Sequence, residues 1–273
     1  MMFLPAYVGS SFWEWARGRH YYRDNWFERD ARAACGEDRS TSQRPRPRFC
    51  PMLKAVIFDV DGTLIDSVDA HGESWRKVLA NYGFGHPFQL VRDQIGKGGD
   101  ELMKALMPAD AIEELGDKIE EERAELFKAE FLPGIKAFPK TRELFQKIEA
   151  AGLRIVLASS AKGDELESYK KLARIDDLIE EATSSDDAER SKPNPDIFLA
   201  AMKKLEGVQV GEAIVVGDSP YDAIAAGKAG LRTIGLLCGG FPEAELRKAG
   251  CMTIYRDPAD LLAHYDESPL GED

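Results

Sequence analysis

Short apolar runs alternate with helical patterns from residue 54 onward. Runs rich in aliphatic and β-branched residues predict five strands and a weaker sixth, at 54–59, 153–158, 178–182, 213–217, 232–236 and 252–255. Between them, apolar positions three and four residues apart predict helices at 139–151, 163–173, 195–206, 220–229, 242–249 and 258–264. Because strands that alternate with helices pair in parallel, we expect an α/β fold, a parallel sheet with helices on both faces.

Residues 67–132 interrupt this alternation. They contain no convincing strand, and their apolar spacing predicts helices at 67–82, 87–94, 99–106 and 109–129. An insert of this size after the first strand predicts a small α-helical cap domain. The α/β core would then consist of residues 52–66 and 133–273.

Residues 1–51 differ in composition from the rest of the chain. Up to residue 50 they hold nine arginines and no lysine, and three of the four tryptophans, Trp13, Trp15 and Trp26. They end in "TSQRPRPRF", where the prolines favour an extended or disordered chain. We interpret this segment as a leader outside the fold, disordered or not native, with Met52 as the natural start. A basic, aromatic arm that binds a partner is the alternative.

Composition limits the partners and the compartment. The formal net charge of -12 argues against nucleic-acid binding, because a phosphate backbone attracts clustered Lys and Arg. No run of about 18 apolar residues is present, so no membrane span is expected. The four cysteines show neither CxxC pairs nor zinc-ligand spacing, which favours a reduced, cytoplasmic setting. No feature of the sequence indicates an oligomeric state.

Polar side chains follow several predicted strands at the point where each strand ends. They are Asp59 and Asp61 after the first strand, Ser159 and Ser160 after the second, and Asp218 after 213–217, with Asp222 one helical turn further. Lys192 adds a cation from the loop "RSKPNPDIF". Because the carboxyl ends of parallel strands meet at one edge of a sheet, we expect a single site there.

The carboxylates of this site would repel one another unless a cation offsets their charge. Mg²⁺ is the natural candidate, because it binds through a few carboxylates and keeps waters for a phosphorylated substrate. Lys192 is suited to bind a phosphoryl oxygen and Ser159 to donate its hydroxyl to another. Backbone amides of the turn after "DVDGT" add donors for the same anion.

Four segments, "DVDGT", "ASS", "SKPNPDIF" and "GDSPYD", resemble the four motifs of the haloacid dehalogenase superfamily. The order of the motifs and the position of the insert resemble the branch whose helical cap lies between the first and second motifs. The resemblance covers residues 54–259 and implies a Rossmann-like core. It also implies a Mg²⁺-dependent reaction on a small phosphorylated metabolite.

The resemblance implies a role for each matching position. Asp59 would be the nucleophile that forms an aspartyl-phosphate, and Asp61 the general acid that protonates the leaving alcohol and then activates water. Ser159 and Lys192 would hold the phosphoryl group, and Ser160 and Thr63 would help to bind substrate. Mg²⁺ would be held by Asp59, the backbone carbonyl of Asp61 and Asp218, with Asp222 nearby, and Gly62 would let the turn open with the cap.

Asp61 favours phosphate-ester chemistry, because the family's C–Cl and C–P cleaving members lack an Asp at this position. A phosphatase that acts on a small organic phosphate monoester is our first interpretation. Gly217 before Asp218 favours it, whereas His71 and Lys162 resemble positions of the β-phosphoglucomutase-like mutases, which are the alternative. We interpret His71 as a hinge or first-cap-helix residue with only a packing role. A non-catalytic protein that binds through its leader is the further alternative.

We expect the cap to determine the substrate specificity. In "IGKGGDEL", residues 95–102, the glycines would bring Lys97 toward the leaving group, or would only join two helices and leave Lys97 exposed. The acidic run within 109–129 is interpreted as a solvated helix face without a functional role, with Ile119, Leu126 and Phe127 turned inward. Phosphoglycolate, a sugar phosphate and a nucleotide remain open as substrates.

Overall fold

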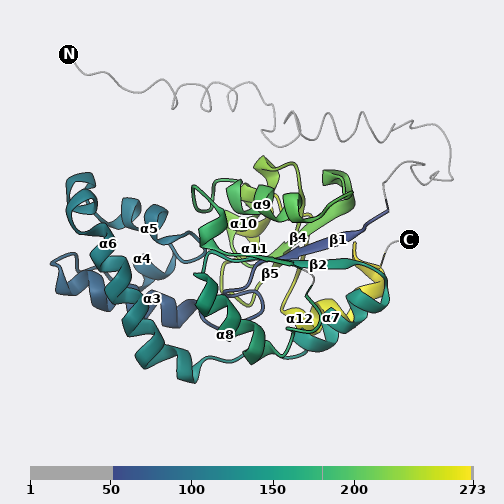
Figure 1. Ribbon diagram of the computed structural model, residues 1–273, viewed down its shortest axis with the longest axis horizontal. Coiled ribbons are helices and arrows are strands. Elements are labelled where there is room, and N and C mark those ends of the chain that lie inside the picture. The colour runs from purple at the N-terminus through teal and green to yellow at the C-terminus, as the bar shows by residue number, and fades with distance from the viewer. Residues whose placement is uncertain (1–51, 180, 272–273) are drawn as a thin grey trace, which may run out of the picture. The chain divides into compact units, whose positions relative to one another are not determined.

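The computed structural model describes residues 52–179 and 181–271. Six strands form one sheet in the order β3-β2-β1-β4-β5-β6, and every pair of neighbours is parallel. The strands are β1 (Ala55–Phe58), β2 (Arg154–Ala158), β3 (Glu181–Thr183), β4 (Ala213–Gly217), β5 (Arg232–Leu236) and β6 (Thr253–Tyr255). This sheet, with β1 at its centre (Figure 1), confirms the predicted α/β fold.

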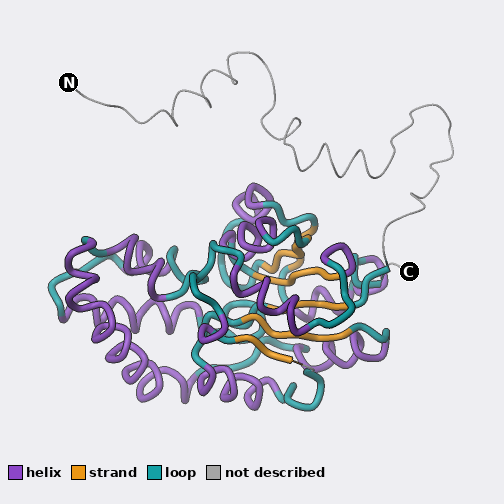
Figure 2. Tube along the Cα trace, turned by 45° about the horizontal axis from the view of Figure 1, so that its top comes forward, coloured by secondary structure: helices purple, strands orange, loops and turns teal. Residues whose placement is uncertain are grey.

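Helices cover both faces of the sheet (Figure 2). Val56 and Phe58 of β1 belong to the apolar cluster that includes residues of α7 (Thr141–Ala150), α8 (Gly163–Ala173) and α12 (Pro258–Ala263). The alternate residues Ala55 and Ile57 belong to the cluster of α9 (Asp196–Lys204) and α10 (Pro220–Lys228). Helix α11 (Glu243–Ala249) lies between β5 and β6. Because successive side chains of a strand point to opposite faces, the wholly apolar β1 is buried on both sides.

Between β1 and α7 the chain forms a group of four α-helices at the left of Figure 1. They are α3 (Val68–Asn81), α4 (Phe88–Arg92), α5 (Gly99–Leu106) and α6 (Ala109–Leu126), followed by a π-helical stretch (Phe127–Phe131) and a 3-10 turn (Leu132–Gly134). These helices have an apolar cluster of their own, which includes Trp75 and Ile119. The structure thus gives the insert a core separate from that of the sheet.

Two predicted elements differ from the structure. The strand expected at 178–182 is wrong in position, since β3 is Glu181–Thr183 and lies at the sheet edge. Leu178 and Ile179 pack against the core from the turn after α8, so their apolar character reflects burial rather than strand pairing. The helix expected at 109–129 changes to π geometry at Phe127, a form that often occurs at functional sites.

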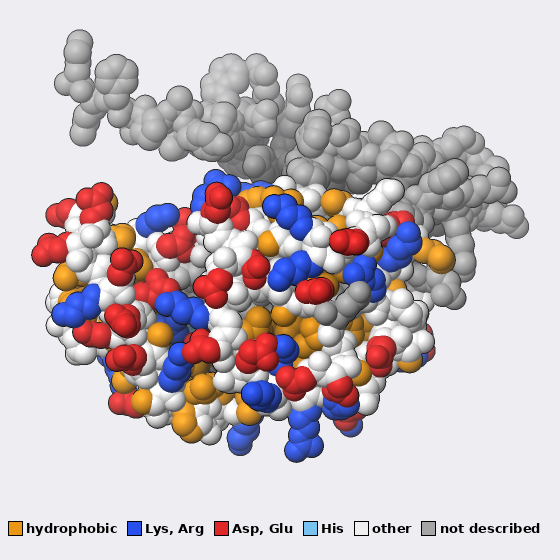
Figure 3. Space-filling model, viewed as in Figure 1, with side chains coloured by type: hydrophobic (Ala, Val, Ile, Leu, Met, Phe, Trp, Pro, Cys, Tyr) orange, Lys and Arg blue, Asp and Glu red, His pale blue; other side chains and the backbone are white. Residues whose placement is uncertain are grey.

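Acidic and basic side chains are interspersed on the face of the described residues shown in Figure 3. No helix among residues 52–179 and 181–271 is both long and apolar enough to cross a membrane. The leader expected at 1–51 lies outside the described residues.

Candidate active site

Lys192 lies at the centre of the first group of site residues. Its side chain is 1% exposed, and its Nζ lies 2.5 Å from Asp59 Oδ1 and 2.8 Å from Asp222 Oδ1. It also donates to the carbonyl oxygen of Ala158 at 3.3 Å. Burial alone would lower the pKa of Lys192, but the charges of Asp222 and Asp59 outweigh burial and raise it. Lys192 therefore remains an ammonium ion in this site.

The start of α10 holds Asp222 in place. Ser219 is the N-cap, and its backbone N and its Oγ donate to Asp222 Oδ2 at 3.0 and 2.7 Å. Asp222 N donates back to Ser219 Oγ at 3.2 Å, which completes a capping box. Asp222 Oδ1 is left to face Lys192. The N-cap of α10 thus also fixes the position of the Asp222 carboxylate in the site.

Asp218 follows β4 and shares a hydrogen-bond donor with Asp59. Thr63 Oγ1 lies 2.8 Å from Asp218 Oδ1 and 2.9 Å from Asp59 Oδ2, yet a hydroxyl has only one proton to donate. Gly62 lies on the other side of Asp218. Its φ is +82°, and a Cβ there would come 2.5 Å from Asp218 Oδ2, so both the turn and the carboxylate require glycine.

The charges of this group do not balance among the described residues. Asp59, Asp218 and Asp222 are buried, and each offers an oxygen within 4.8 Å of the others, against the single cation of Lys192. Burial and the charge of Asp222 raise the pKa of Asp59 to about 7. Burial and the charge of Asp59 raise the pKa of Asp218 well above its usual range. The donor set therefore fits a hard divalent cation, which would offset this repulsion.

The two serines after β2 are placed differently. Ser159 is fully buried, and its Oγ accepts a hydrogen bond from the backbone N of Ala161 at 3.0 Å. Ser160 lines the cavity between cap and core, together with Asp59 and Asp61. Ser160 is thus open to a ligand in this structure, whereas Ser159 shapes the turn beneath it.

Asp61 lies two residues after Asp59 but faces other neighbours. Ser67 Oγ donates to Asp61 Oδ1 at 2.6 Å, and His71 Nε2 lies 2.9 Å from the same oxygen. Burial alone would raise the pKa of Asp61, but His71 and the hydrogen bonds from His71 and Ser67 hold it below its ordinary value. Asp61 is therefore a carboxylate in this state.

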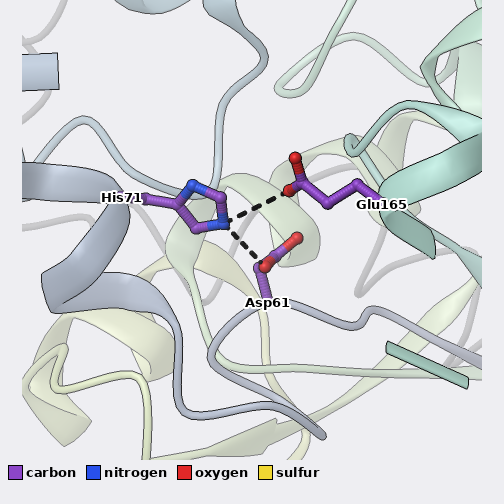
Figure 4. A group of neighbouring side chains, drawn as sticks. All are labelled: Asp61, His71 and Glu165. Carbon is purple, nitrogen blue, oxygen red and sulfur yellow. Dashed lines mark hydrogen bonds and ion pairs between the residues drawn. The ribbon is translucent and has the colours of Figure 1, made fainter. Parts of the chain in front are cut away.

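His71 comes from α3 in the cap and meets residues of three other elements. Figure 4 shows its Nε2 facing both Asp61 and Glu165 of α8, the latter with Oε1 at 3.6 Å. The ring stacks on Phe127 with centroids 4.1 Å apart, but the expected role in packing alone is wrong, because Nε2 also contacts Asp61 at 2.9 Å. Arg123 Nη1 lies 3.4 Å from His71 Nδ1. Because a guanidinium can only donate, this contact favours the tautomer in which Nδ1 accepts from Arg123 and Nε2 donates to Asp61.

A cavity separates the cap from the carboxyl edge of the sheet. The core contributes Asp59, Asp61, Ser160, Ala161, Lys162 and Glu165, and the cap His71, Trp75, residues 95–99, Glu120 and Arg123. Lys97 is half-buried, with Nζ 2.6 Å from Gln94 Oε1 and 4.7 Å from the centre of the Tyr221 ring. Burial lowers its pKa. A Cβ at Gly98 would overlap the hydroxyl of Ser191, so the absence of a side chain lets this loop sit on the core.

Several residues of the site were missed by the sequence analysis. No role was expected for the acidic run or for Arg123, but Glu120 and Arg123 line the cavity. The sequence does indicate that Arg123 faces inward, because it lies four residues after Ile119 and four before Phe127, on the inward face of the helix. Glu165 and Tyr169 have the same spacing on α8, and both are buried.

A doubly wound parallel sheet with carboxylates at its carboxyl edge, beneath a helical cap, defines a capped α/β enzyme. Comparison with known proteins gives the family. A family model described as "Haloacid dehalogenase-like hydrolase" matches residues 56–236, more than half of the chain. The chain belongs to this family, in the branch that contains its phosphatases, and the resemblance of the four motifs is confirmed.

Relatives and solved structures agree with this placement. A "Phosphorylated carbohydrates phosphatase" of Thermotoga maritima is 30% identical over 217 residues, which cover 77% of this chain and 97% of the relative. A hydrolase from Pseudomonas syringae is 33% identical with a TM-score of 0.71, covering 78% of this chain and 98% of that structure. A provisionally named beta-phosphoglucomutase from Bacteroides vulgatus is 26% identical with a TM-score of 0.69, covering 81% and 91%.

Proposed function

We propose that the protein is a Mg²⁺-dependent phosphatase that hydrolyses small organic phosphate monoesters through an aspartyl-phosphate on Asp59. The observation that carries the proposal is the arrangement at the end of β1. There, Asp59 contacts a buried lysine and shares a donor with Asp218, while Asp61 lines the same cavity with a separate set of partners. These separate surroundings support Asp59 as the nucleophile and Asp61 as the group that transfers protons.

Mg²⁺ would be held by Asp59, Asp218 and the backbone carbonyl of Asp61, with Asp222 nearby. When bound, it neutralises negative charge on the carboxylates and on the phosphoryl oxygens. Lys192 offsets part of the charge of Asp59 and Asp222 from the buried side of the site. Thr63 fixes the orientation of Asp59 and Asp218 through its hydroxyl.

The reaction would proceed in two steps. A carboxylate oxygen of Asp59 attacks phosphorus, the bond from phosphorus to the ester oxygen breaks, and the leaving oxygen takes a proton from Asp61. Asp61 then takes a proton from water, whose oxygen attacks the aspartyl-phosphate and releases phosphate and Asp59. His71 and Ser67 orient Asp61 in both steps.

Asp61 must change protonation during this cycle. Without substrate its pKa lies below the ordinary value, so it is a carboxylate, the form that the second step needs. A phosphoryl dianion bound in the cavity adds negative charge beside Asp61. Like charge favours the protonated form, which the first step needs.

The cavity lining supports a phosphorylated polyol, such as a sugar phosphate, as the substrate class. It holds both cations and carboxylates, Lys97, Arg123, Lys162, Glu120 and Glu165. Hydroxyl groups donate and accept, so they can pair with both kinds of side chain, whereas an additional carboxylate on the substrate would be repelled by the acidic ones. The relative named for phosphorylated carbohydrates agrees with this choice.

A cytoplasmic setting and the absence of nucleic-acid partners are part of the proposal. The described cysteines, Cys238 and Cys251, are free thiols, which agrees with a reducing compartment. The acidic net charge of -12 disfavours a nucleic-acid partner.

Hydrolysis of p-nitrophenyl phosphate with and without Mg²⁺ tests the proposal. Turnover should require the metal, and Asp59→Asn should lower kcat about 10⁴-fold or more, because the nucleophile is lost. Asp66→Asn, at an exposed position on the same turn, is the matched control and should change little. Turnover by Asp59→Asn at the rate of the unmodified protein would contradict the proposal.

A sugar-phosphate mutase is the second candidate, and the contact between His71 and Asp61 favours it, since the resemblance to mutases includes this histidine. A mutase returns the phosphoryl group to a sugar rather than to water. Glucose 1-phosphate separates the two candidates. Conversion to glucose 6-phosphate faster than release of phosphate would favour the mutase, and the reverse would favour the phosphatase.

A further inference from the structure

We propose that Tyr169 and Glu165 of α8 are positioning residues that hold His71, and through it Asp61, in the geometry required for proton transfer. The inference rests on the proposed function, because it concerns the acid and base of that reaction. It adds two residues of the core that lie outside the four motifs. It also gives the contact between cap and core a role in the chemistry.

Tyr169 and Glu165 form a buried pair. They lie four residues apart on α8, on one face of the helix, and are 1% and 4% exposed. Tyr169 Oη donates to Glu165 Oε1 at 3.1 Å. Burial and the carboxylates of Asp61 and Glu165 raise the pKa of Tyr169, so the hydroxyl keeps its proton. The pair is therefore a fixed donor and acceptor.

This pair meets His71 at the ring nitrogen that faces Asp61. Tyr169 Oη lies 3.1 Å from His71 Nε2. Glu165 Oε1 lies 3.6 Å from the same nitrogen, and Figure 4 shows the two side chains facing each other. Phe127 covers one face of the ring, and Arg123 contacts the opposite nitrogen, Nδ1. The imidazole is thus fixed at its face and at both nitrogens. Without Tyr169 and Glu165, Asp61 would be its remaining partner at Nε2.

The same atoms resemble a metal site, since Asp61, His71 and Glu165 offer ligand atoms within 4.8 Å of one another. A metal would need the lone pair of His71 Nε2. The contact from Arg123 to Nδ1 favours the tautomer with its proton on Nε2, which then has no free lone pair. The contacts of Nε2 with Asp61 and Tyr169 therefore favour a hydrogen-bond network over a second metal centre.

The network joins three parts of the chain. Asp61 lies in the turn after β1, His71 on α3 of the cap, and Tyr169 and Glu165 on α8 of the core. His71 reaches the α8 pair only where the cap meets the core. Full orientation of Asp61 would therefore accompany closure of the cap over a substrate, when water is excluded.

The test compares two esters that differ in their need for an acid. p-Nitrophenolate leaves without a proton, whereas the alkoxide of benzyl phosphate needs one. kcat/KM reports the steps up to release of the leaving group, so it isolates the acid role of Asp61. Tyr169→Phe should lower kcat/KM about tenfold for benzyl phosphate and less than about twofold for p-nitrophenyl phosphate.

Two further variants make the test specific. Glu165→Ala should act like Tyr169→Phe, and Glu165→Gln, which keeps an acceptor for Tyr169, should retain most of the benzyl phosphate activity. Tyr221→Phe is the matched control, because Tyr221 donates to the backbone oxygen of Asp93 in the cap at 2.6 Å without contacting Asp61. It should change the two esters by the same factor.

Each outcome decides a separate claim. An unchanged ratio of the two esters in Tyr169→Phe and Glu165→Ala, in an otherwise active enzyme, would overturn this inference alone. Equal losses for both esters would mean that the pair serves only the fold. Failure of the unmodified protein to hydrolyse either ester, or hydrolysis of only p-nitrophenyl phosphate, would contradict the proposed function itself.

Discussion

Asp59 and Asp61 are separated by a single residue, yet their electrostatic surroundings are opposite. Asp59 faces Asp218, Asp222 and Lys192, and burial with the charge of Asp222 raises its pKa to about 7. Asp61 faces Ser67 and His71, which hold its pKa below the ordinary value despite burial. The two carboxylates of one turn are therefore suited to different chemical roles. The repulsion around Asp59 favours a metal, whereas the donors around Asp61 favour proton transfer.

The two surroundings also have different origins. The partners of Asp59 come from strand ends and their following loops, all within the core. The partners of Asp61 come from the cap helix α3 and, through His71, from α6 and α8. The first group is assembled by the sheet itself, and the second depends on the contact between cap and core. The predictions below test this division, beginning with the largest effect.

Lys192→Met should destabilise the protein most. It leaves Asp59 and Asp222 buried without their cation, and breaking a buried ion pair in this way costs about 3–5 kcal/mol of unfolding free energy. Urea denaturation in EDTA measures the loss. Lys54→Met is the matched control, because Lys54 is half-exposed where it pairs with Glu212. This substitution should lower the free energy of unfolding by less than about 1 kcal/mol. Equal losses would contradict the central place of Lys192.

Mg²⁺ should stabilise the protein increasingly as pH rises. In the metal-free fold the pKa of Asp59 rises from 3.8 to about 7, so the folded state binds more protons than the unfolded state between these values. Unfolding free energy is therefore lost as pH rises through this range, and the metal should restore it. At a concentration about 100 times its Kd, Mg²⁺ should add about 2.7 kcal/mol.

Thermal unfolding between pH 5 and pH 8, each with about 10 mM Mg²⁺ or EDTA, measures this effect. Asp218→Asn should abolish most of the Mg²⁺-dependent shift. Asp61 contributes with the opposite sign, because its lowered pKa adds stability above its ordinary value that is lost on acidification. A Mg²⁺-dependent shift that shrinks toward high pH would contradict the assignment of the metal to the Asp59 side.

Lys97→Met should have the smallest effect of the series. Lys97 lines the cavity from the cap and lies far in sequence from both carboxylates. Loss of its charge should raise KM for a sugar phosphate about tenfold and leave kcat within about twofold, because it removes uniform binding. Steady-state kinetics of phosphate release measures both. A large fall in kcat with unchanged KM would instead assign Lys97 to the reaction step.

Most of the fold and the Asp59 group could be predicted from the sequence. Parallel strands leave a clear pattern of short apolar runs, and the residue after each run lies at one edge of the sheet. Sheet geometry therefore brings Asp59 and Asp218 together, and the loop before α9 adds Lys192. The third strand was misplaced because Leu178 and Ile179 are partly buried after α8 without strand pairing, and an apolar pair alone does not distinguish a turn from a strand.

The partners of Asp61 could not be predicted in the same way. Their contacts depend on how α3, α6 and α8 pack against one another, and each helix shows only which of its faces is buried. Arg123 occupies an inward position between Ile119 and Phe127, but its place in a run of charged residues gave no indication that it lines the cavity. Tyr169 resembles an ordinary core residue. Polar residues at inward-facing positions of a helix are therefore the sequence signal that indicates such site residues.

The most direct test of the division between Asp59 and Asp61 is the pre-steady-state release of p-nitrophenolate by Asp61→Asn. p-Nitrophenolate needs no acid, so Asp59 should still be phosphorylated, but water would lack its base. We predict a burst of about one equivalent per chain followed by slow turnover, with the phosphoryl group found on Asp59 by mass spectrometry. Steady release without a burst, or a burst that persists in Asp59→Asn, would contradict the account.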